Sequence, residues 1–184
     1  MPHKQKAMAD LNNIQQMVEE DYQQVKEIWQ TEAKKAHQPF IPENYWDSKE
    51  VVDNFKREIK NPKNERYVYK NNERKIKGFI IAYPYIQLSK AYIAEMYIDS
   101  NSQNKGIGTA FFKTLQGENH KFPQLKGKYK QFTSHVYVHN SISISWHIKN
   151  NFKITGIHFC PKTGLPKLAM RWEKITKELE ECKK

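Results

Sequence analysis

The sequence predicts an α/β (α+β) fold, because the spacing of its apolar residues switches repeatedly between the period of a strand and the period of a helix. Read from the N-terminus, the predicted order is β-α-α-β-β-β-α-β-α-β-β. A polar turn that holds Gly106 and Gly108, two of only seven glycines, marks one passage from strand to helix. A chain of 184 residues forms one domain with a substantial core but is short for two. We therefore expect a single domain over residues 1–172 and a charged helical tail over residues 173–184.

The first third of the chain predicts one strand and two helices. Residues 14–18 alternate apolar and polar side chains, as a half-buried strand does. Over residues 21–35 the apolar residues recur at spacings of three and four, which predicts an amphipathic helix. The prolines within residues 37–42 end this helix. Asp47, followed three residues later by Glu50, resembles a capping box and predicts that the second helix begins there.

The rest of the chain predicts six strands and two further helices. Asn71 and Asn72 predict a turn between the first two of these strands. A basic stretch with glycine and proline, residues 117–130, predicts a long connection. The predicted strands are residues 66–70, 77–85, 92–98, 131–139, 152–158 and 167–172, and the predicted helices are residues 108–116 and 141–150.

Composition narrows the class of protein. No apolar run approaches the roughly 20 residues that span a bilayer, and the N-terminus lacks the apolar segment of a signal peptide. Cys160 and Cys182 lie outside any metal-binding or redox spacing, so we expect no metal and a reducing cytoplasm. The net charge of +11 invites a nucleic-acid-binding function, but the lysines are spread along the chain. Positive charge would equally attract a ligand that carries phosphates.

The polar turn before residue 108 has the chemistry of a pyrophosphate-binding loop. A helix N-terminus presents unpaired N–H groups and partial positive charge, and glycine lets the backbone approach an anion closely. The stretch Gln103–Gly108 resembles the Q/R-x-x-G-x-G/A signature of the GNAT superfamily, the acetyl-CoA-dependent N-acetyltransferases. The segment Asn140–Phe152 resembles the second signature of that family, N-x-x-A-x-x-F-Y-x-x-x-G-F. On these two matches the chain is identified as a member of the superfamily, of its small, single-domain bacterial type.

The resemblance implies a central mixed, mostly antiparallel sheet that is splayed between its fourth and fifth strands and flanked by about four helices. It also implies that acetyl-CoA is the cosubstrate and lies along the splayed strand and the glycine turn. For Asn140 we consider two roles, a contact with the pantetheine arm and the N-cap of a helix. The residues implied for cofactor binding are Met96, Tyr97, Ile98, Gln103, Asn104, Lys105, Gly106, Ile107, Gly108, Thr109 and Asn140.

Two residues are candidates for catalysis. Acetyl transfer to an amine requires a deprotonated amine and a proton for the departing thiolate. The family usually places a tyrosine where this chain has His147, which either replaces it as the acid, only packs or bonds near the sulfur, or marks a weak or inactive enzyme. Glu95 is the best-placed carboxylate for a base; alternatively it faces solvent or pairs with a lysine, and ordered water deprotonates the amine. Asn151 replaces a family glycine, and asparagine tolerates a left-handed backbone.

An aromatic segment between the first two helices, together with one strand tyrosine, is the candidate acceptor site. Mobile aromatic loops shape pockets, although such side chains also serve as core. The candidate residues are His37, Phe40, Tyr45, Trp46 and Tyr137. A polyamine, an amino acid, an antibiotic and a protein N-terminus or lysine all remain open as acceptors.

The predicted function is direct transfer of an acetyl group from acetyl-CoA to a primary amine of a small molecule or protein in a ternary complex. Direct transfer is favoured because neither cysteine lies in a recognisable nucleophile motif. The alternative is a CoA-binding sensor or scaffold that has lost turnover, and the third possibility is a basic nucleic-acid-binding protein. We expect a monomer or homodimer without a membrane partner.

Overall fold

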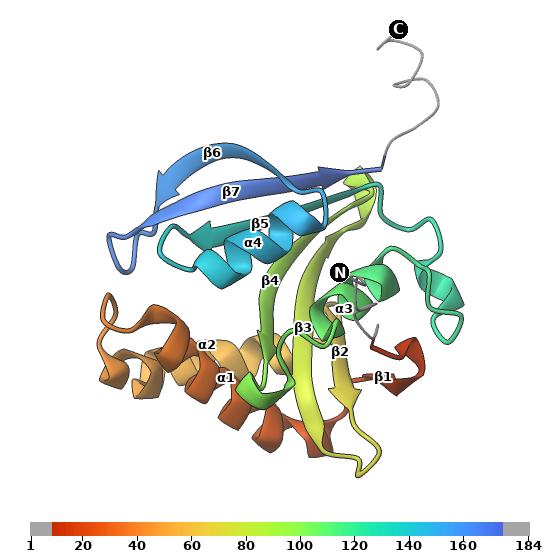
Figure 1. The fold of residues 1–184 in the computed structure, drawn as a ribbon, viewed down its shortest axis with the longest axis horizontal. Coiled ribbons are helices and arrows are strands. Elements are labelled where there is room, and N and C mark those ends of the chain that lie inside the picture. Colours follow the sequence, from red (N-terminus) through yellow and green to blue (C-terminus); the bar gives the residue numbers. More distant parts are fainter. Residues whose placement is uncertain (1–8, 175–184) are drawn as a thin grey trace, which may run out of the picture.

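The computed structural model describes residues 9–174 and confirms the predicted α/β (α+β) class (Figure 1). Strands and helices follow one another in the predicted order. The strands are β1 (Ile14–Gln16), β2 (Glu65–Lys70), β3 (Ile76–Tyr85), β4 (Lys90–Ile98), β5 (Gln131–Tyr137), β6 (Lys153–Phe159) and β7 (Pro166–Glu173). The helices are α1 (Tyr22–His37), α2 (Lys49–Lys60), α3 (Ile107–Leu115) and α4 (Ser141–Lys149). Within the described range, none of these helices is long and apolar enough to cross a membrane.

The strands form one sheet in the order β1-β2-β3-β4-β5-β7-β6. Neighbouring strands are antiparallel except β4 and β5, which run parallel. These two strands pair only over residues 90–93 and 131–134, and they separate beyond Ile93 and Ser134. The mostly antiparallel sheet with a splay between its fourth and fifth strands is therefore confirmed. In the gap, main-chain groups of β4 are left without a partner from β5, so an extended ligand has hydrogen-bonding groups to meet.

Two hydrophobic cores lie on opposite faces of this sheet. Successive residues of a strand point to opposite faces, and β3 shows it directly. Phe79 and Ile81 pack with apolar residues of α1 and α2, whereas Ile80 and Ala82 pack with those of α3. In Figure 1, α3 and α4 lie in front of the sheet. The sheet therefore separates an α1–α2 side from an α3–α4 side, and the splay connects the two.

A β-bulge in β4 coincides with the start of the splay. Ala82 of β3 pairs with Ile93 and Ile81 pairs with Glu95, so Ala94 is an extra residue on β4. A bulge re-aims the side chains beyond it. Residues three apart in a regular strand point to opposite faces, but here Tyr92 and Glu95 both point to the α1–α2 side with their partners on β3. The bulge therefore places Glu95 on the face opposite the glycine turn.

Three sequence predictions need correction or fall outside the described residues. The capping box was wrong: Asp47 lies in a 3-10 turn (Glu43–Asp47), and its carboxylate bonds to Lys34 at 2.7 Å. Ser48 is the N-cap of α2 and makes no side-chain cap. The first helix extends to His37, two residues beyond the predicted end, and β7 continues through Glu173. The predicted helical tail otherwise lies outside the described residues.

Candidate functional site

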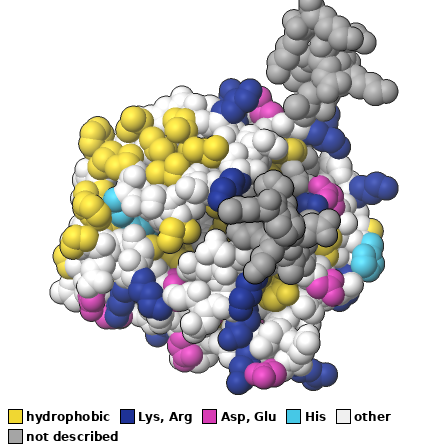
Figure 2. Space-filling view, in the orientation of Figure 1, with side chains coloured by type: hydrophobic (Ala, Val, Ile, Leu, Met, Phe, Trp, Pro, Cys, Tyr) yellow, Lys and Arg dark blue, Asp and Glu magenta, His cyan; other side chains and the backbone are white. Residues whose placement is uncertain are grey.

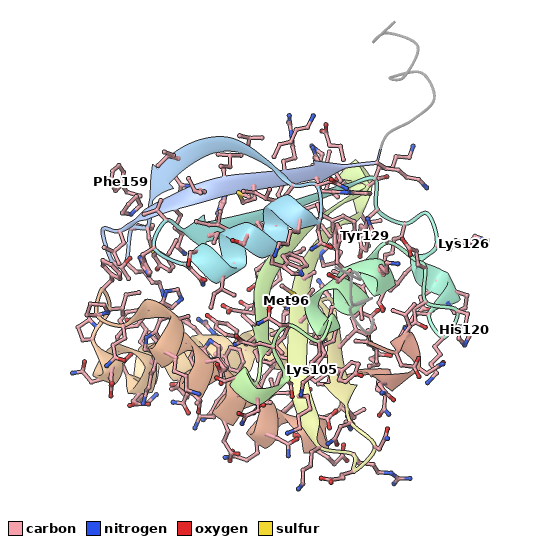
Figure 3. All side chains as sticks on the ribbon, in the orientation of Figure 1. Met96, Lys105, His120, Lys126, Tyr129 and Phe159 are labelled. Atoms are coloured by element: carbon pink, nitrogen blue, oxygen red, sulfur yellow. The ribbon has the colours of Figure 1, made fainter. Side chains whose placement is uncertain are left out.

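A cavity of about 1120 Å³ has walls on both sides of the sheet and is lined by both strands at the splay. On the α3–α4 side its walls come from the glycine turn, the start of α3 and the exposed face of α4. On the other side they come from α1, α2 and the strands β3, β4, β5 and β7. Met96, labelled in Figure 3, lies two residues before the end of β4 and lines the cavity beside the gap. Two ligands that enter from opposite faces would therefore meet at the splay.

Most of the residues expected from the sequence line this cavity. Of the expected cofactor-binding residues, all but Lys105 do so, and both catalytic candidates do so as well. The expected acceptor-site residues His37, Tyr45, Trp46 and Tyr137 also line it, whereas Phe40 does not. Lys105 instead donates from Nζ to the carbonyl oxygen of Asn101 at 2.7 Å.

The glycine turn ends in a helix N-terminus with unpaired amides. Gly106 is the N-cap of α3 at a φ of 85°, in the left-handed region that favours glycine, and it makes no side-chain cap. The helix ladder starts with the Ala110 amide, which donates to the carbonyl of Gly106 at 2.9 Å. Over residues 9–174 the preceding amides of α3, at residues 107–109, have no hydrogen-bond partner. Such a terminus attracts an anion through its N–H groups and its partial positive charge.

Contacts with β4 and α1 hold this turn in place. The side-chain amide of Gln103 donates to the carbonyl of Ile98 at 3.1 Å, which ties the turn to the end of β4. Glu32 of α1 is 7% exposed and accepts from the hydroxyl of Ser100 at 2.7 Å and from its amide at 3.2 Å. A charge-assisted hydrogen bond of this kind is among the stronger ones in proteins. The turn is therefore preorganised by side chains before any ligand binds.

Gly108 and Trp146 bring α3 and α4 close together at the same end of the cavity. A Cβ at Gly108 would lie 2.8 Å from the indole Nε1 of Trp146, a distance too short for a non-bonded contact. The indole N–H is buried and unpaired in the described part of the chain. Unpaired amides and close backbone approach together fit a ligand that carries phosphate oxygens. The residues present therefore fit the pyrophosphate and pantetheine of a CoA thioester.

Of the two roles considered for Asn140, the structure shows that of N-cap, at the start of α4. Its side-chain oxygen accepts the amide of Ser143 at 3.0 Å. At the other end of the helix, Asn151 has a φ of 65°, so the left-handed backbone expected there is confirmed. Asn140 also lines the cavity, which leaves its side-chain nitrogen as the group available to a ligand.

His147 is buried and neutral. It is 3% exposed, and its Nδ1 lies 2.8 Å from the carbonyl oxygen of Ser143, so Nδ1 carries the proton. Burial lowers the pKa of His147 to about 4, against a smaller raising effect of that hydrogen bond. Nε2 is then an unprotonated acceptor, and no residue within 9–174 bonds to it. The ring is arranged to accept a proton or hydrogen bond and not to donate one.

The neutral state of His147 predicts a specific loss of stability in acid. Because its pKa is lower folded than unfolded, the unfolded chain takes up the proton first as the pH falls below about 6.5. At pH 4.5 this costs about 2 kcal/mol of unfolding free energy. His147→Phe should therefore lose less stability than the wild type between pH 7 and pH 4.5 in urea unfolding. His120→Phe, at an exposed histidine, is the control and should keep the wild-type decline; equal declines in all three proteins would contradict this assignment.

Glu95 lies among partly buried groups on the α1–α2 side of the gap. Burial raises the pKa of Glu95 to about 7; Lys167 opposes this shift and Glu58 adds to it. Burial, followed by interaction with Glu58 and Glu95, also raises the pKa of Tyr83. A carboxyl group with a pKa near the working pH is matched to proton transfer. Its raised pKa and its place in the cavity wall make Glu95 a candidate for proton transfer.

The aromatic segment after α1 forms a packed cluster with β5. The ring of His37, 4% exposed, packs on Trp46 and on Tyr137 at centroid distances of 5.2 and 4.8 Å. Its Nδ1 lies 3.0 Å from Nε2 of His139, and burial lowers the pKa of His37 to about 4. Phe40 stacks on His139 at 4.2 Å outside the cavity. The structure thus brings the five expected acceptor-site residues together, with four of them in the wall.

Cys160 contributes a reactive sulfur to the same end of the cavity. Burial would raise the pKa of this thiol, but hydrogen bonds from the Thr163 and Tyr137 side chains and from the loop amides lower it to about 6. The hydroxyl of Tyr137 lies 3.4 Å from the sulfur. The lowered pKa favours the thiolate form, so Cys160 is a candidate nucleophile to be tested in any transfer reaction.

Sequence reasoning missed several residues of the acceptor side. Glu58 and Lys167 line the cavity together with Tyr83 and His135. A signal for Glu58 was present, because it follows the buried Phe55 by three residues, a spacing that makes the two side chains neighbours on α2. Nothing in the local sequence marks Lys167, which reaches the cavity only because β7 is inserted between β5 and β6.

Comparison with known proteins identifies the family. The model of the acetyltransferase (GNAT) family matches residues 16–152, and the chain therefore belongs to that family. No curated protein matches the sequence significantly.

Solved structures share the fold at low sequence identity. The PaiA N-acetyltransferase of Thermoplasma acidophilum, solved in complex with coenzyme A, is 22% identical with a TM-score of 0.64, covering 88% of this chain and 98% of its own. Ard1 of Thermoplasma volcanium is 17% identical with a TM-score of 0.63, covering 89% and 97%. The ribosomal-protein-S18-alanine N-acetyltransferase of Escherichia coli is 16% identical with a TM-score of 0.62, covering 90% and 97%. At these identities the likeness shows the fold alone.

Proposed function

We propose that this protein is an N-acetyltransferase that moves the acetyl group of acetyl-CoA to a primary amine by direct transfer in a ternary complex. The observation that carries the proposal is the cavity that joins both faces of the sheet at the splay. One end offers the unpaired amides of α3, and the other offers Glu95. Donor and acceptor can therefore enter from opposite sides and meet at the gap in β4 and β5.

The donor half of the cavity binds acetyl-CoA, which supplies an activated acetyl group. The amides at residues 107–109 hold the pyrophosphate, and the exposed edge of β4 around Met96 bonds the pantetheine amides. The side-chain nitrogen of Asn140 adds a donor. That a protein of the same fold was solved with coenzyme A supports this assignment.

Glu95 is the proposed base, acting directly or through one water. An amine reaches this site mostly protonated, and it becomes a nucleophile only after it loses a proton. With its pKa at about 7, Glu95 is about half ionised at neutral pH and accepts that proton. The neighbouring Lys167 favours the ionised form, because a positive charge stabilises a carboxylate.

For His147, the buried neutral ring favours packing or hydrogen bonding near the donor over the role of acid. A group with a pKa of about 4 is almost wholly unprotonated at pH 7, so it has no proton to give to the thiolate. We therefore assign proton delivery to water or to a hydroxyl in the cavity. This observation also keeps open the second candidate, a CoA-binding sensor without turnover.

We further propose that residues 1–172 form a single catalytic domain that works in the cytoplasm. A free thiolate such as Cys160 is preserved in a reducing compartment. Figure 2 shows Lys and Arg side chains at several separate places on one face, some of them in a run below the centre of the view. The spread of the lysines along the chain supports a small-molecule reaction over nucleic-acid binding.

The test is release of free CoA thiol from acetyl-CoA in the presence of a panel of primary amines, with mass detection of the acetylated product. The proposal predicts amine-dependent thiol release with an equal amount of acetylated amine. Acetyl-CoA binding without acetylation of any amine would reject the enzyme and favour the sensor. A His147→Tyr variant further separates the enzyme from the sensor. Tyrosine restores a proton donor, so it should increase the acetylation rate of an enzyme and have no effect on a sensor that lacks turnover.

A further inference from the structure

The acceptor half of the cavity has two walls of opposite charge. One wall, from α2, β3 and β4, carries the carboxylates of Glu58 and Glu95 together with the phenol of Tyr83. The other, from β5 and β7, carries His135 and Lys167. His158 of β6 extends this second wall, since its ring lies 4.1 Å from that of His135. An acceptor in this space therefore faces carboxyl groups on one side and, on the other, the ammonium group of Lys167 beside the imidazole of His135.

The strand register positions Lys167, but no carboxylate of the described residues pairs with its ammonium group. In the register of β5, β6 and β7 it pairs with both Tyr137 and His158, so the three side chains share one face. Its Nζ lies 4.2 Å from the centre of the Tyr137 ring, a cation–π contact that fixes the side chain. Among residues 9–174 it has no carboxylate within ion-pair distance, unlike Lys162, which pairs with Glu50 at 3.3 Å. The ammonium group of Lys167 is thus available to a ligand.

Lys167 also lies close to the proposed base. It is near enough to Glu95 to favour the ionised carboxylate. A ligand that bridges the two walls would therefore place its amine at Glu95 and its negative charge at Lys167. A partly buried cation gains most from an oxygen anion, because desolvation strengthens a charge-assisted hydrogen bond.

We propose that the acceptor is a small primary amine that also carries a carboxylate or another oxyanion, with its amine at Glu95 and Glu58 and its oxyanion at Lys167. This assignment rests on the proposed acetyl transfer and adds the substrate class. A diamine fits less well, since its second ammonium group would face the ammonium group of Lys167. An apolar amine would leave the ammonium group of Lys167 without a partner at the moment when the ligand excludes water.

Pairs of an amino acid and the amine left by its decarboxylation provide the test. Lysine with cadaverine and phenylalanine with phenethylamine differ only in the carboxylate. The specificity constant kcat/KM for acetylation should be about 10- to 100-fold higher for the amino acid of at least one pair, the size of one hydrogen bond to a charged group. Preference for the decarboxylated amine in every pair would overturn the inference and leave acetyl transfer intact.

Variants at Lys167 locate the effect. Lys167→Met keeps most of the side-chain length and removes the charge. It should abolish the preference through a loss that is larger for the amino acid than for its amine, because both members share only the smaller loss that follows from a raised pKa of Glu95. Lys167→Arg should restore part of the preference. Arg171→Met is the matched control, because it removes a cation from the same strand outside the cavity. It should leave the preference unchanged. Equal losses for both members of a pair in Lys167→Met would also overturn the inference.

A calorimetric titration with acetyl-CoA separates this inference from the function on which it rests. Every variant should bind acetyl-CoA as the wild type does, because Lys167 lies on the acceptor side. If acetyl-CoA binds but no amine of any pair is acetylated, acetyl transfer itself is rejected, and the substrate class with it.

Discussion

Gly106→Glu is expected to lower the affinity for acetyl-CoA by about 100-fold or more, equivalent to ~2.7 kcal/mol. Two physical effects act together. A side chain at a φ of 85° is strained by about 1–2 kcal/mol, which disturbs the N-cap of α3. The new carboxylate also stands where the unpaired amides of residues 107–109 attract the pyrophosphate, and like charges repel. Calorimetric titration with acetyl-CoA measures the change directly.

Gly127→Glu is the matched control for this variant. Gly127 also has a positive φ, 72°, and no atom lies within 4 Å of a Cβ built there. The substitution therefore imposes similar backbone strain and the same charge, but on the connection between α3 and β5. It should keep wild-type affinity for acetyl-CoA. Equal losses in both variants would show that strain or net charge, and not the glycine turn, controls binding.

Glu95→Gln is expected to reduce kcat by about 10²- to 10⁴-fold at pH 7, the usual contribution of a positioned general base. Glutamine keeps the shape of the side chain but cannot accept the proton of the amine. Acetyl-CoA affinity should be unchanged, because Glu95 lies on the opposite side of the gap from the glycine turn. Glu50→Gln, at a carboxylate 78% exposed outside the cavity, is the control and should retain activity.

The pH profile distinguishes a base from a structural carboxylate. Glu95 works when ionised, so kcat/KM should rise with pH through about 7 in the wild type. Glu95→Gln should lose this limb and keep only the rise that belongs to the amine itself. A wild-type profile with no limb near pH 7, or a variant that retains it, would contradict the assignment and favour water as the base.

Neighbouring charges should move that limb in opposite directions. Lys167 lowers the pKa of Glu95, so Lys167→Met should shift the midpoint upwards. Glu58 raises it, so Glu58→Gln should shift the midpoint downwards. Shifts in the same direction would mean that the limb reports another group.

Much of the fold follows from local patterns in the sequence. The alternating residues of β3 and the three- and four-residue spacing of α1 reflect burial on one face, which periodicity reports directly. The boundary at Asp47 was missed because its carboxylate bonds to Lys34 of α1 and not to the backbone of α2. Tertiary contact overrode a local capping signal there.

The donor half of the site was predictable to a greater extent than the acceptor half. The glycine turn is contiguous in the chain, so Gly106 and Gly108 carry its signal within a few residues. The acceptor half is assembled from α2, β4 and β7, and its charges meet only through the order of strands in the sheet. The orientation of Glu95 depends on the extra residue Ala94, and no sequence pattern marks that bulge. Lys105 matched the turn in sequence, yet its ammonium group bonds to a carbonyl of the same turn.

The most direct test of the account follows the labelled acetyl group of acetyl-CoA through a single turnover with excess protein. Direct transfer at the splay predicts that the label passes to an added amine at the same rate as thiol is released, and that no label is found on the protein before or after. A label that accumulates on the protein and disappears in Cys160→Ala would contradict direct transfer. A label that remains on bound acetyl-CoA with every amine would contradict the proposal that the protein is an acetyltransferase.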